Sequence, residues 1–300
     1  GEKVKTNYIV AVATRADCRH QGMMRSLLQA SLQEMYRREE TFTWLMPAAE
    51  AIYRPFGFRF IYEKNKMTVT ADVLQRAETD KNWQIHSDQE VSGDIFCEEA
   101  KKEDLAELAC FAEKQLSKLA EVYTVHGIAY FEQRMQEVGC EGGSLIRKEK
   151  EICGYFLALK KDREAWEIVV EDAVQKKAFP AVLHWFGASE EKCTFTAFPQ
   201  IWEQYAQSEN VPAIMGRIVH LERFVCCLKI KKEQEWKIRL TDSLIPENNG
   251  YFIIKTGIEG GSLIRVENLS EKEKKMFCSM DIGQLTEELF RLPVFLNEVV

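Results

Sequence analysis

The sequence predicts an α+β protein with more than one domain. Its 300 residues, 46% of them hydrophobic, are too many for one small core and fit two or three domains. Near the N-terminus a strand rich in β-branched residues runs into an amphipathic helix, and a second mixture of strands and helices follows residue 92. The turn signal Asn248-Asn249-Gly250 stands between two later apolar stretches, as between antiparallel strands.

The first junction of strand and helix lies within residues 8–35. The stretch from Tyr8 to Thr14 (YIVAVAT) has the Val, Ile and Tyr content of a buried strand. After Gly22, apolar residues recur at helical spacing, at Met24, Leu27, Leu28, Leu32 and Met35. The strand is therefore expected to enter the helix through the short turn RADCRHQG.

This turn is a candidate anion site. The first N–H groups of a helix lack intrahelical partners, and the helix dipole places partial positive charge there. Gly22 lets a ligand approach the backbone, and Arg19 supplies a cation three residues earlier. Arg15, His20 and Arg25 add basic side chains. The alternative interpretation is a solvated basic turn with an ordinary helix-starting glycine.

Composition limits the compartment and the partners. Nine cysteines occur without a C-x-x-C pair, which indicates neither a disulfide framework nor a zinc site, so we expect a cytoplasmic chain without a metal. The net charge of −7 does not favour a nucleic-acid partner and is compatible with a cationic substrate, and no apolar run is long enough to span a bilayer. Four histidines are expected to be structural or exposed rather than catalytic: His86, His126, His184 and His220.

The next stretch, residues 41–65, alternates between strand and helix. The pattern predicts a strand over Phe42 to Met46, a short helix around Ala48 to Tyr53, a turn at Arg54 to Gly57 and another strand over Phe58 to Tyr62.

Four pieces in this order resemble the GCN5-related N-acetyltransferases, in detail their enhanced-intracellular-survival-type branch. They are the T-x-x-x-x-R-x-x-G turn, the helix after it, the WLMPA strand and the AIYRPFGF segment. The resemblance implies that the anion is the pyrophosphate of acetyl-coenzyme A and that the backbone of Val12, Ala13 and Thr14 holds the pantetheine arm. The residues that it implies around the phosphates are Arg19, His20, Gln21, Gly22, Met23 and Met24.

The resemblance also implies a mixed-sheet acetyltransferase domain that lacks its front. The family's fold places several strands and helices before the strand that here begins near residue 8. We therefore expect residues 1–65 to be the C-terminal part of a catalytic domain, incomplete on its N-terminal side.

Tyr53 resembles the family's general acid, which gives a proton to the departing coenzyme A thiolate. The alternative is an aromatic side chain that packs beside Phe56 and Phe58. In this superfamily the amine attacks the thioester itself, so no cysteine nucleophile is required and Cys18 is expected to be incidental.

Two further segments complete the resemblance. Residues 66–190 contain a predicted strand, helices over Asp104 to Leu119 and Ile128 to Val138, and a hairpin of Gly143–Arg147 with Glu151–Leu159. They resemble a second, degenerate acetyltransferase-like domain. Residues 191–300 resemble the sterol-carrier-like α+β domain that closes the survival-type chains.

The heptapeptide EGGSLIR occurs twice, at residues 141–147 and 259–265. In both copies Leu-Ile follows the glycines and continues a strand instead of opening a helix, so we expect two independent strand starts and not a duplicated phosphate loop.

The chain end is the last candidate site. By the resemblance, the main-chain carboxylate of Val300 is the base that accepts the proton of the amine, with the Glu298 side chain as the alternative. A third interpretation is that Val299 and Val300 only complete a strand or helix of the last domain.

Together these features predict an acetyl-coenzyme A-dependent N-acetyltransferase that acts on a primary amine of an aminoglycoside, a polyamine or a lysine-like substrate. The resemblance implies a homo-oligomer, a trimer or hexamer, without nucleic-acid or membrane partners. The competing hypothesis is a non-catalytic ligand-binding scaffold.

Overall fold

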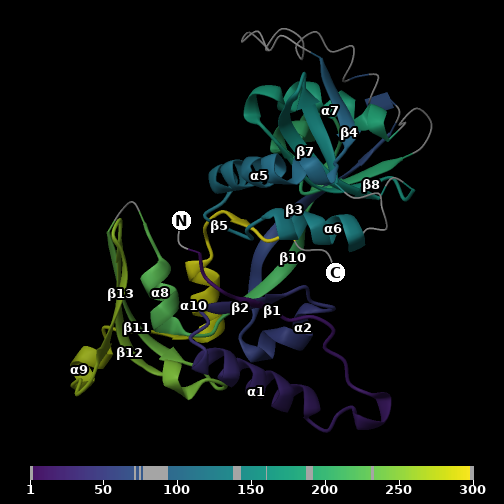
Figure 1. The fold of residues 1–300 in the computed structure, drawn as a ribbon. Helices are drawn as coiled ribbons and strands as arrows, with labels where there is room; N and C mark the ends of the chain where they lie inside the picture. Colours follow the sequence, from purple (N-terminus) through teal and green to yellow (C-terminus); the bar gives the residue numbers. More distant parts are fainter. Residues whose placement is uncertain are drawn as a thin grey trace. The chain divides into compact units, whose positions relative to one another are not determined.

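The structure is a computed structural model that describes residues 3–70, 72, 73, 76, 94–137, 143–159, 161–186, 192–230 and 233–297. The chain divides into two compact units (Figure 1). Unit 1 contains residues 1–62 and 213–292, and unit 2 contains residues 63–212 and 293–299. The predicted mixed α+β class is confirmed. The division into segments 1–65, 66–190 and 191–300 stays a prediction.

Unit 1 begins with the predicted alternation of strand and helix. Its first sheet has the strand order β1-β2-β10-β3. The elements of this part are β1 (Asn7–Tyr8), α1 (Met23–Arg37), β2 (Phe42–Leu45), α2 (Glu50–Tyr53), β3 (Arg59–Val69) and β10 (Ser208–Ile218). Strand β1 runs parallel to β2, and β2 runs antiparallel to β10. Helix α1 buries Leu28, Leu32 and Met35 in one hydrophobic cluster with Leu45 and Phe58.

The later part of unit 1 is a second, four-stranded sheet of order β13-β12-β11-β14. Its elements are α8 (Leu221–Cys227), β11 (Gln234–Thr241), β12 (Gly250–Gly257), β13 (Gly260–Val266), α9 (Glu271–Lys274), β14 (Cys278–Asp281) and α10 (Ile282–Leu289). Strands β11 and β12 are antiparallel and flank the Asn-Asn-Gly turn, which confirms that expectation. A likeness of this part to sterol-carrier domains stays a prediction.

Unit 2 is a sheet of order β3-β9-β8-β7-β6-β4, covered on both faces. Its elements are β4 (Ile95–Glu99), α5 (Leu105–Leu119), β5 (Val122–Tyr123), α6 (Ile128–Glu137), β6 (Gly143–Lys148), β7 (Glu151–Leu159), β8 (Glu164–Val170), α7 (Gln175–Trp185), β9 (Cys193–Thr196) and β15 (Val294–Phe295). Successive residues of β7 point to opposite faces, so Tyr155 packs with Leu108 and Leu116 of α5, and Phe156 packs with Phe179 and Val182 of α7.

The two EGGSLIR copies both lead into strands. Gly143–Lys148 pairs with β7, and Gly260–Val266 pairs with β12. The prediction of two strand starts is therefore confirmed for the described part of each copy. No helix of the described residues combines the length and apolar character that crossing a membrane requires.

A buried ion pair connects the distant segments of unit 1. Arg217 of β10 is fully buried, and its Nη2 donates to Asp242 Oδ1 at 2.6 Å. Its Nε donates to the carbonyl of Phe56 at 2.8 Å, and Nη1 donates to that of Ile218 at 3.1 Å. Asp242 Oδ1 also accepts the Leu244 amide at 3.0 Å. The pair thus fixes the turn before β3, the end of β10 and the loop after β11.

The turn before β3 leaves no room for a side chain next to this pair. Gly57 has φ +84°, a left-handed conformation that favours glycine. A Cβ there would lie 2.8 Å from Ile282 Cγ2 and 3.1 Å from Arg217 Nε. Glycine is therefore required by both the backbone and the packing.

We expect Asp242→Leu to lower the free energy of unfolding of the chain by about 3–5 kcal/mol, because Arg217 would stay buried without an opposite charge. Urea denaturation followed by circular dichroism measures the change. Adding Arg217→Leu to this variant should recover part of the loss, because the uncompensated charge is then removed.

The matched control is Glu34→Ala, which removes an exposed partner of Arg37 and Arg38 and should change stability little. An Asp242→Leu protein as stable as the parent would contradict a structural role for the buried pair.

Candidate functional site

The turn before α1 is an exposed basic loop with a defined hydrogen-bond pattern. A 3₁₀ turn over Ala16–Cys18 opens it. Arg15 is paired with Asp17 through Nε at 3.1 Å and Nη2 at 2.7 Å. Arg19 Nε donates to the carbonyl of Thr14 at 3.3 Å, which ties the two ends of the turn together. Gln21 Nε2 donates to the Asp17 carbonyl at 3.1 Å. The charge of Arg15 is thus matched by Asp17, and among the described residues no carboxylate forms an ion pair with Arg19.

The turn leads into α1 through two residues with left-handed backbone conformation. His20 has φ +62° and Gly22 has φ +78°. Gly22 is the N-cap of α1, no side chain caps the helix, and the first intrahelical bond runs from the Ser26 amide to the Gly22 carbonyl at 3.1 Å. The amides of Met23 and Met24 therefore have no intrahelical acceptor. A Cβ on Gly22 would meet nothing within 4 Å, so the space beside Gly22 at the start of the helix is open. The structure brings the predicted residues 19–24 together at one helix N-terminus.

The strand before the turn is shorter than the predicted Tyr8 to Thr14. Strand β1 ends at Tyr8, and the last bond to β2 is from the Ile9 amide to the Trp44 carbonyl at 2.9 Å. Ala11 then adopts φ +55°, which interrupts an extended chain. The prediction of a strand through Thr14 was wrong, because the chain turns away from β2 at Ala11. In the part of the chain that the structure describes, the backbone groups of Val12 and Ala13 have no recorded hydrogen-bond partner.

Tyr53 lies at the end of the one-turn helix α2. Its side chain is 6% exposed and packs edge-on against Phe58, with ring centroids 6.0 Å apart. It shares a hydrophobic cluster with Leu28 and Leu32 of α1. Burial raises the pKa of the Tyr53 phenol above its ordinary value. The phenol is thus protonated at neutral pH in a poorly solvated setting.

A contact between the first turn of α1 and the segment after Tyr53 joins the two parts of the site. The Arg25 guanidinium lies over the ring of Phe56, 5.2 Å from its centroid. The carbonyl of Phe56 is also the one that accepts from buried Arg217. The ion pair of the core therefore helps to position the segment next to the turn.

The predicted base lies outside the described residues. Val300 and the alternative Glu298 both fall outside the described residues, so their role stays a prediction.

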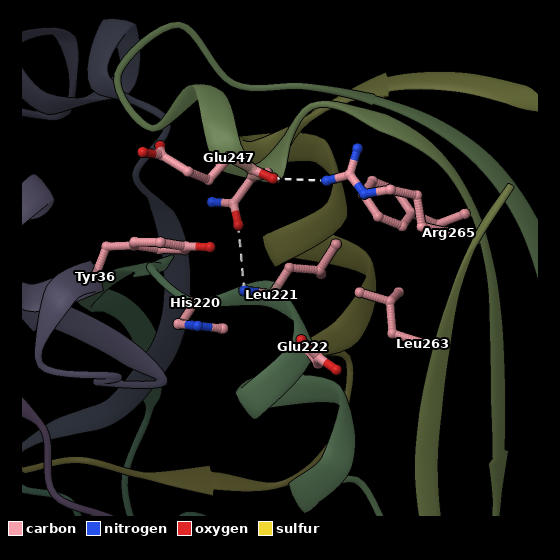
Figure 2. A pocket seen from close by; sticks show the side chains of 9 residues that line it. Tyr36, His220, Leu221, Glu222, Glu247, Leu263 and Arg265 are labelled. Carbon is pink, nitrogen blue, oxygen red and sulfur yellow. Dashed lines mark hydrogen bonds between the residues drawn. The ribbon is translucent and has the colours of Figure 1, made fainter. Parts of the chain in front are cut away.

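A separate cavity of about 120 Å³ lies at the other end of α1 (Figure 2). Tyr36 and His220 form one end of it, with parallel rings 4.4 Å apart, and Arg265 lies at the other (Figure 2). Burial and then the carboxylates of Glu247 and Glu222 raise the pKa of Tyr36, and burial lowers the pKa of His220. Tyr36 lies fourteen positions after Gly22, about 20 Å along the helix axis. No local pattern in the sequence predicts this cavity, because its walls come from four separate segments.

The comparisons with known proteins agree with this geometry. Residues 1–61 match the family model of the acetyltransferase (GNAT) domain. The match contains the turn, α1 and Tyr53. No curated protein sequence matches the chain.

Solved structures extend the likeness of fold to nearly the whole chain. A GCN5-related N-acetyltransferase from Kribbella flavida is 12% identical, with 99% of this chain and 81% of that chain covered at a TM-score of 0.71. A probable N-acyltransferase from Enterococcus faecalis V583 is 15% identical, with 95% and 71% covered at 0.70. Eis1 from Mycobacterium abscessus is 14% identical, with 94% and 71% covered at 0.63. The expected GNAT domain is confirmed for residues 1–61, and the solved structures confirm the likeness of fold.

Proposed function

We propose that the chain is an acetyl-coenzyme A-dependent N-acetyltransferase of the enhanced-intracellular-survival type. The observation that carries the proposal is the open N-terminus of α1 behind Gly22, inside the 61 residues that match the GNAT domain. The fold likeness to Eis1 supports the choice of branch.

The residues of the turn fit a pyrophosphate. The free amides of Met23 and Met24 and the positive end of the helix dipole would bind its oxygens, and Gly22 leaves the approach open. Arg19 would add charge from its fixed position on the Thr14 carbonyl. The backbone of Val12 and Ala13, which has no hydrogen-bond partner among the described residues, would hold the pantetheine arm as an added strand.

Acetyl-coenzyme A would supply the acetyl group as an activated thioester. The buried phenol of Tyr53 holds the proton that a departing thiolate needs, since its raised pKa keeps it protonated. The proton of the attacking amine would pass to the main-chain carboxylate of Val300, with the Glu298 side chain as the alternative acceptor. These roles balance the transfer of one acetyl group and two protons.

The substrate proposed is a primary amine of an aminoglycoside, a polyamine or a lysine-like molecule. The net charge of −7 supports a cationic substrate by favouring its approach. A homo-oligomer, trimer or hexamer, and a cytoplasmic location belong to the same proposal.

Calorimetric titration with acetyl-coenzyme A distinguishes this enzyme from the alternative, a non-catalytic scaffold. The enzyme should bind the cofactor and release free thiol when a polyamine is added. A scaffold should do neither.

We expect Gly22→Glu to abolish binding of acetyl-coenzyme A, measured by the same titration. The substitution puts a carboxylate in front of the amides and strains a residue at φ +78°. The matched control is Asn268→Glu, which introduces the same side chain at φ +57° on an exposed position of unit 1. Unchanged affinity in the Gly22→Glu protein would contradict the phosphate site.

The Tyr53→Phe variant should keep its affinity for acetyl-coenzyme A and lose turnover by about 10²- to 10⁴-fold, because it lacks only the proton donor. Thiol release measures turnover. Tyr36→Phe is the control, since it removes a hydroxyl from a residue packed against the same cluster. If Tyr53→Phe turns over at the parent rate with every amine tested, Tyr53 serves only in packing.

Appending Gly-Ser-Gly to the chain tests the terminal base, because it moves the α-carboxylate and leaves every side chain in place. We expect turnover to fall by about 10²-fold or more, with cofactor affinity retained. Full activity in the extended protein, combined with loss in Glu298→Gln, would transfer the role to Glu298.

A further inference from the structure

Unit 2 contains a buried cluster of hydrogen-bonded polar side chains that the proposed acetyl transfer does not use. Glu167 and Tyr155 are fully buried, and His126 is 1% exposed. The Tyr155 hydroxyl donates to Glu167 Oε1 at 2.9 Å, and the Tyr130 hydroxyl donates to Oε2 at 3.1 Å. His126 Nδ1 lies 3.1 Å from the Tyr155 oxygen and 3.0 Å from Glu167 Oε1. On the other side of the ring, His126 Nε2 lies 3.1 Å from Thr124 Oγ1.

The hydrogen-bond partners of each group indicate where the protons of this polar cluster lie. The Tyr155 hydroxyl donates to Glu167 Oε1, and His126 Nδ1 faces both the Tyr155 oxygen and Glu167 Oε1, which places the ring proton on Nδ1. In a neutral imidazole the proton on Nδ1 leaves a lone pair on Nε2. That lone pair faces the Thr124 hydroxyl, which donates to it. His126 is therefore oriented as a base toward Thr124, with a carboxylate behind it.

The backbone of β8 is deformed at Glu167, the residue that provides the buried carboxylate. Glu167 has φ +58° within strand β8, a conformation that is unfavourable for a side chain of this size. Tyr155 pairs with Val169 and Leu157 pairs with Trp166, so the register of β7 and β8 shifts and Glu167 lies in the resulting bulge. Bulges redirect side chains, and strained residues persist where the surroundings hold them, often at functional sites.

The polar cluster ends at the hydroxyl of Thr124, which is less buried than His126, Tyr155 and Glu167. Thr124 is half-buried, while His126, Tyr155 and Glu167 are almost inaccessible. It follows directly on β5, whose Tyr123 pairs with Phe295 of β15, so its backbone is anchored by a strand pairing. Thr124 is thus the half-buried hydroxyl that faces the imidazole, while the hydroxyl of half-buried Tyr130 is bonded to Glu167.

We propose that Thr124 is a nucleophile that accepts a small acyl group from an activated ester or thioester. Thr124 Oγ1 forms a bond to the acyl carbon while its proton passes to His126 Nε2. The bond from the acyl carbon to the leaving oxygen or sulfur breaks, and the leaving group takes the proton from His126. The products are O-acyl-Thr124 and a free alcohol or thiol. Tyr155 and Glu167 position the ring of His126 and stabilise its charged form.

The test uses the full chain and p-nitrophenyl acetate, which carries no coenzyme A, so its outcome does not depend on the proposed cofactor site. Release of p-nitrophenol gives the rate, and peptide mass spectrometry locates the acetyl group. We expect one acetyl group on Thr124. His126→Gln and Glu167→Gln should slow its formation, the former by about 10²-fold or more.

Two conservative variants distinguish a nucleophilic role of Thr124 from a purely structural one. Thr124→Ser should retain acetylation at this position, and Thr124→Val, of the same shape, should abolish it. Ser117→Ala, which removes an exposed hydroxyl from α5, is the matched control and should react like the parent.

The proposal is overturned if the parent acquires acetyl groups only on other side chains, or if Thr124→Val releases p-nitrophenol at the parent rate. If circular dichroism shows that His126→Gln or Glu167→Gln fails to fold, the Ser and Val variants of Thr124 decide alone.

Discussion

The buried guanidinium of Arg217 is the constraint on which unit 1 depends. A cation removed from water needs an opposite charge and saturated hydrogen bonds, and Asp242 with the carbonyls of Phe56 and Ile218 supplies them. Because Phe56 follows Tyr53 closely, the same cation fixes the place of the proposed acid. Gly57 is part of this arrangement, since any Cβ there would press on the guanidinium. Core stability and site geometry are thus coupled through one side chain.

The basic turn shows which groups the charge and the backbone would contribute to the proposed anion site. Arg15 is matched by Asp17, and Arg19 is tied to the Thr14 carbonyl. The donors that remain available are main-chain amides at the start of α1, placed by the left-handed backbone at His20 and Gly22. A site of this kind depends on backbone conformation more than on the number of basic side chains.

The two buried polar clusters differ in where they end. Every polar atom of the Arg217 guanidinium is directed into the interior of unit 1, so that cluster holds segments together. The cluster around Glu167 is equally buried but leads outward through His126 to the half-buried Thr124. The deformed backbone at Glu167 belongs to the second cluster, which is why only that cluster suggests chemistry.

The sequence by itself determined the elements whose signals are local. The helix after Gly22, the hairpin of β6 and β7 and the turn before β12 follow from hydrophobic spacing and turn residues within a few positions of each other. The turn that enters α1 is contiguous in the sequence, so the place of the proposed anion site could be predicted as well. The tertiary structure alone decided where the first strand ends, because a strand needs a partner and Ala11 leaves β2. It also decided the Arg217–Asp242 pair, the cavity at Tyr36 and the Thr124–His126–Glu167 arrangement. Each of these brings together side chains from separate segments, and the free energy of burying charge depends on neighbours that sequence spacing does not reveal.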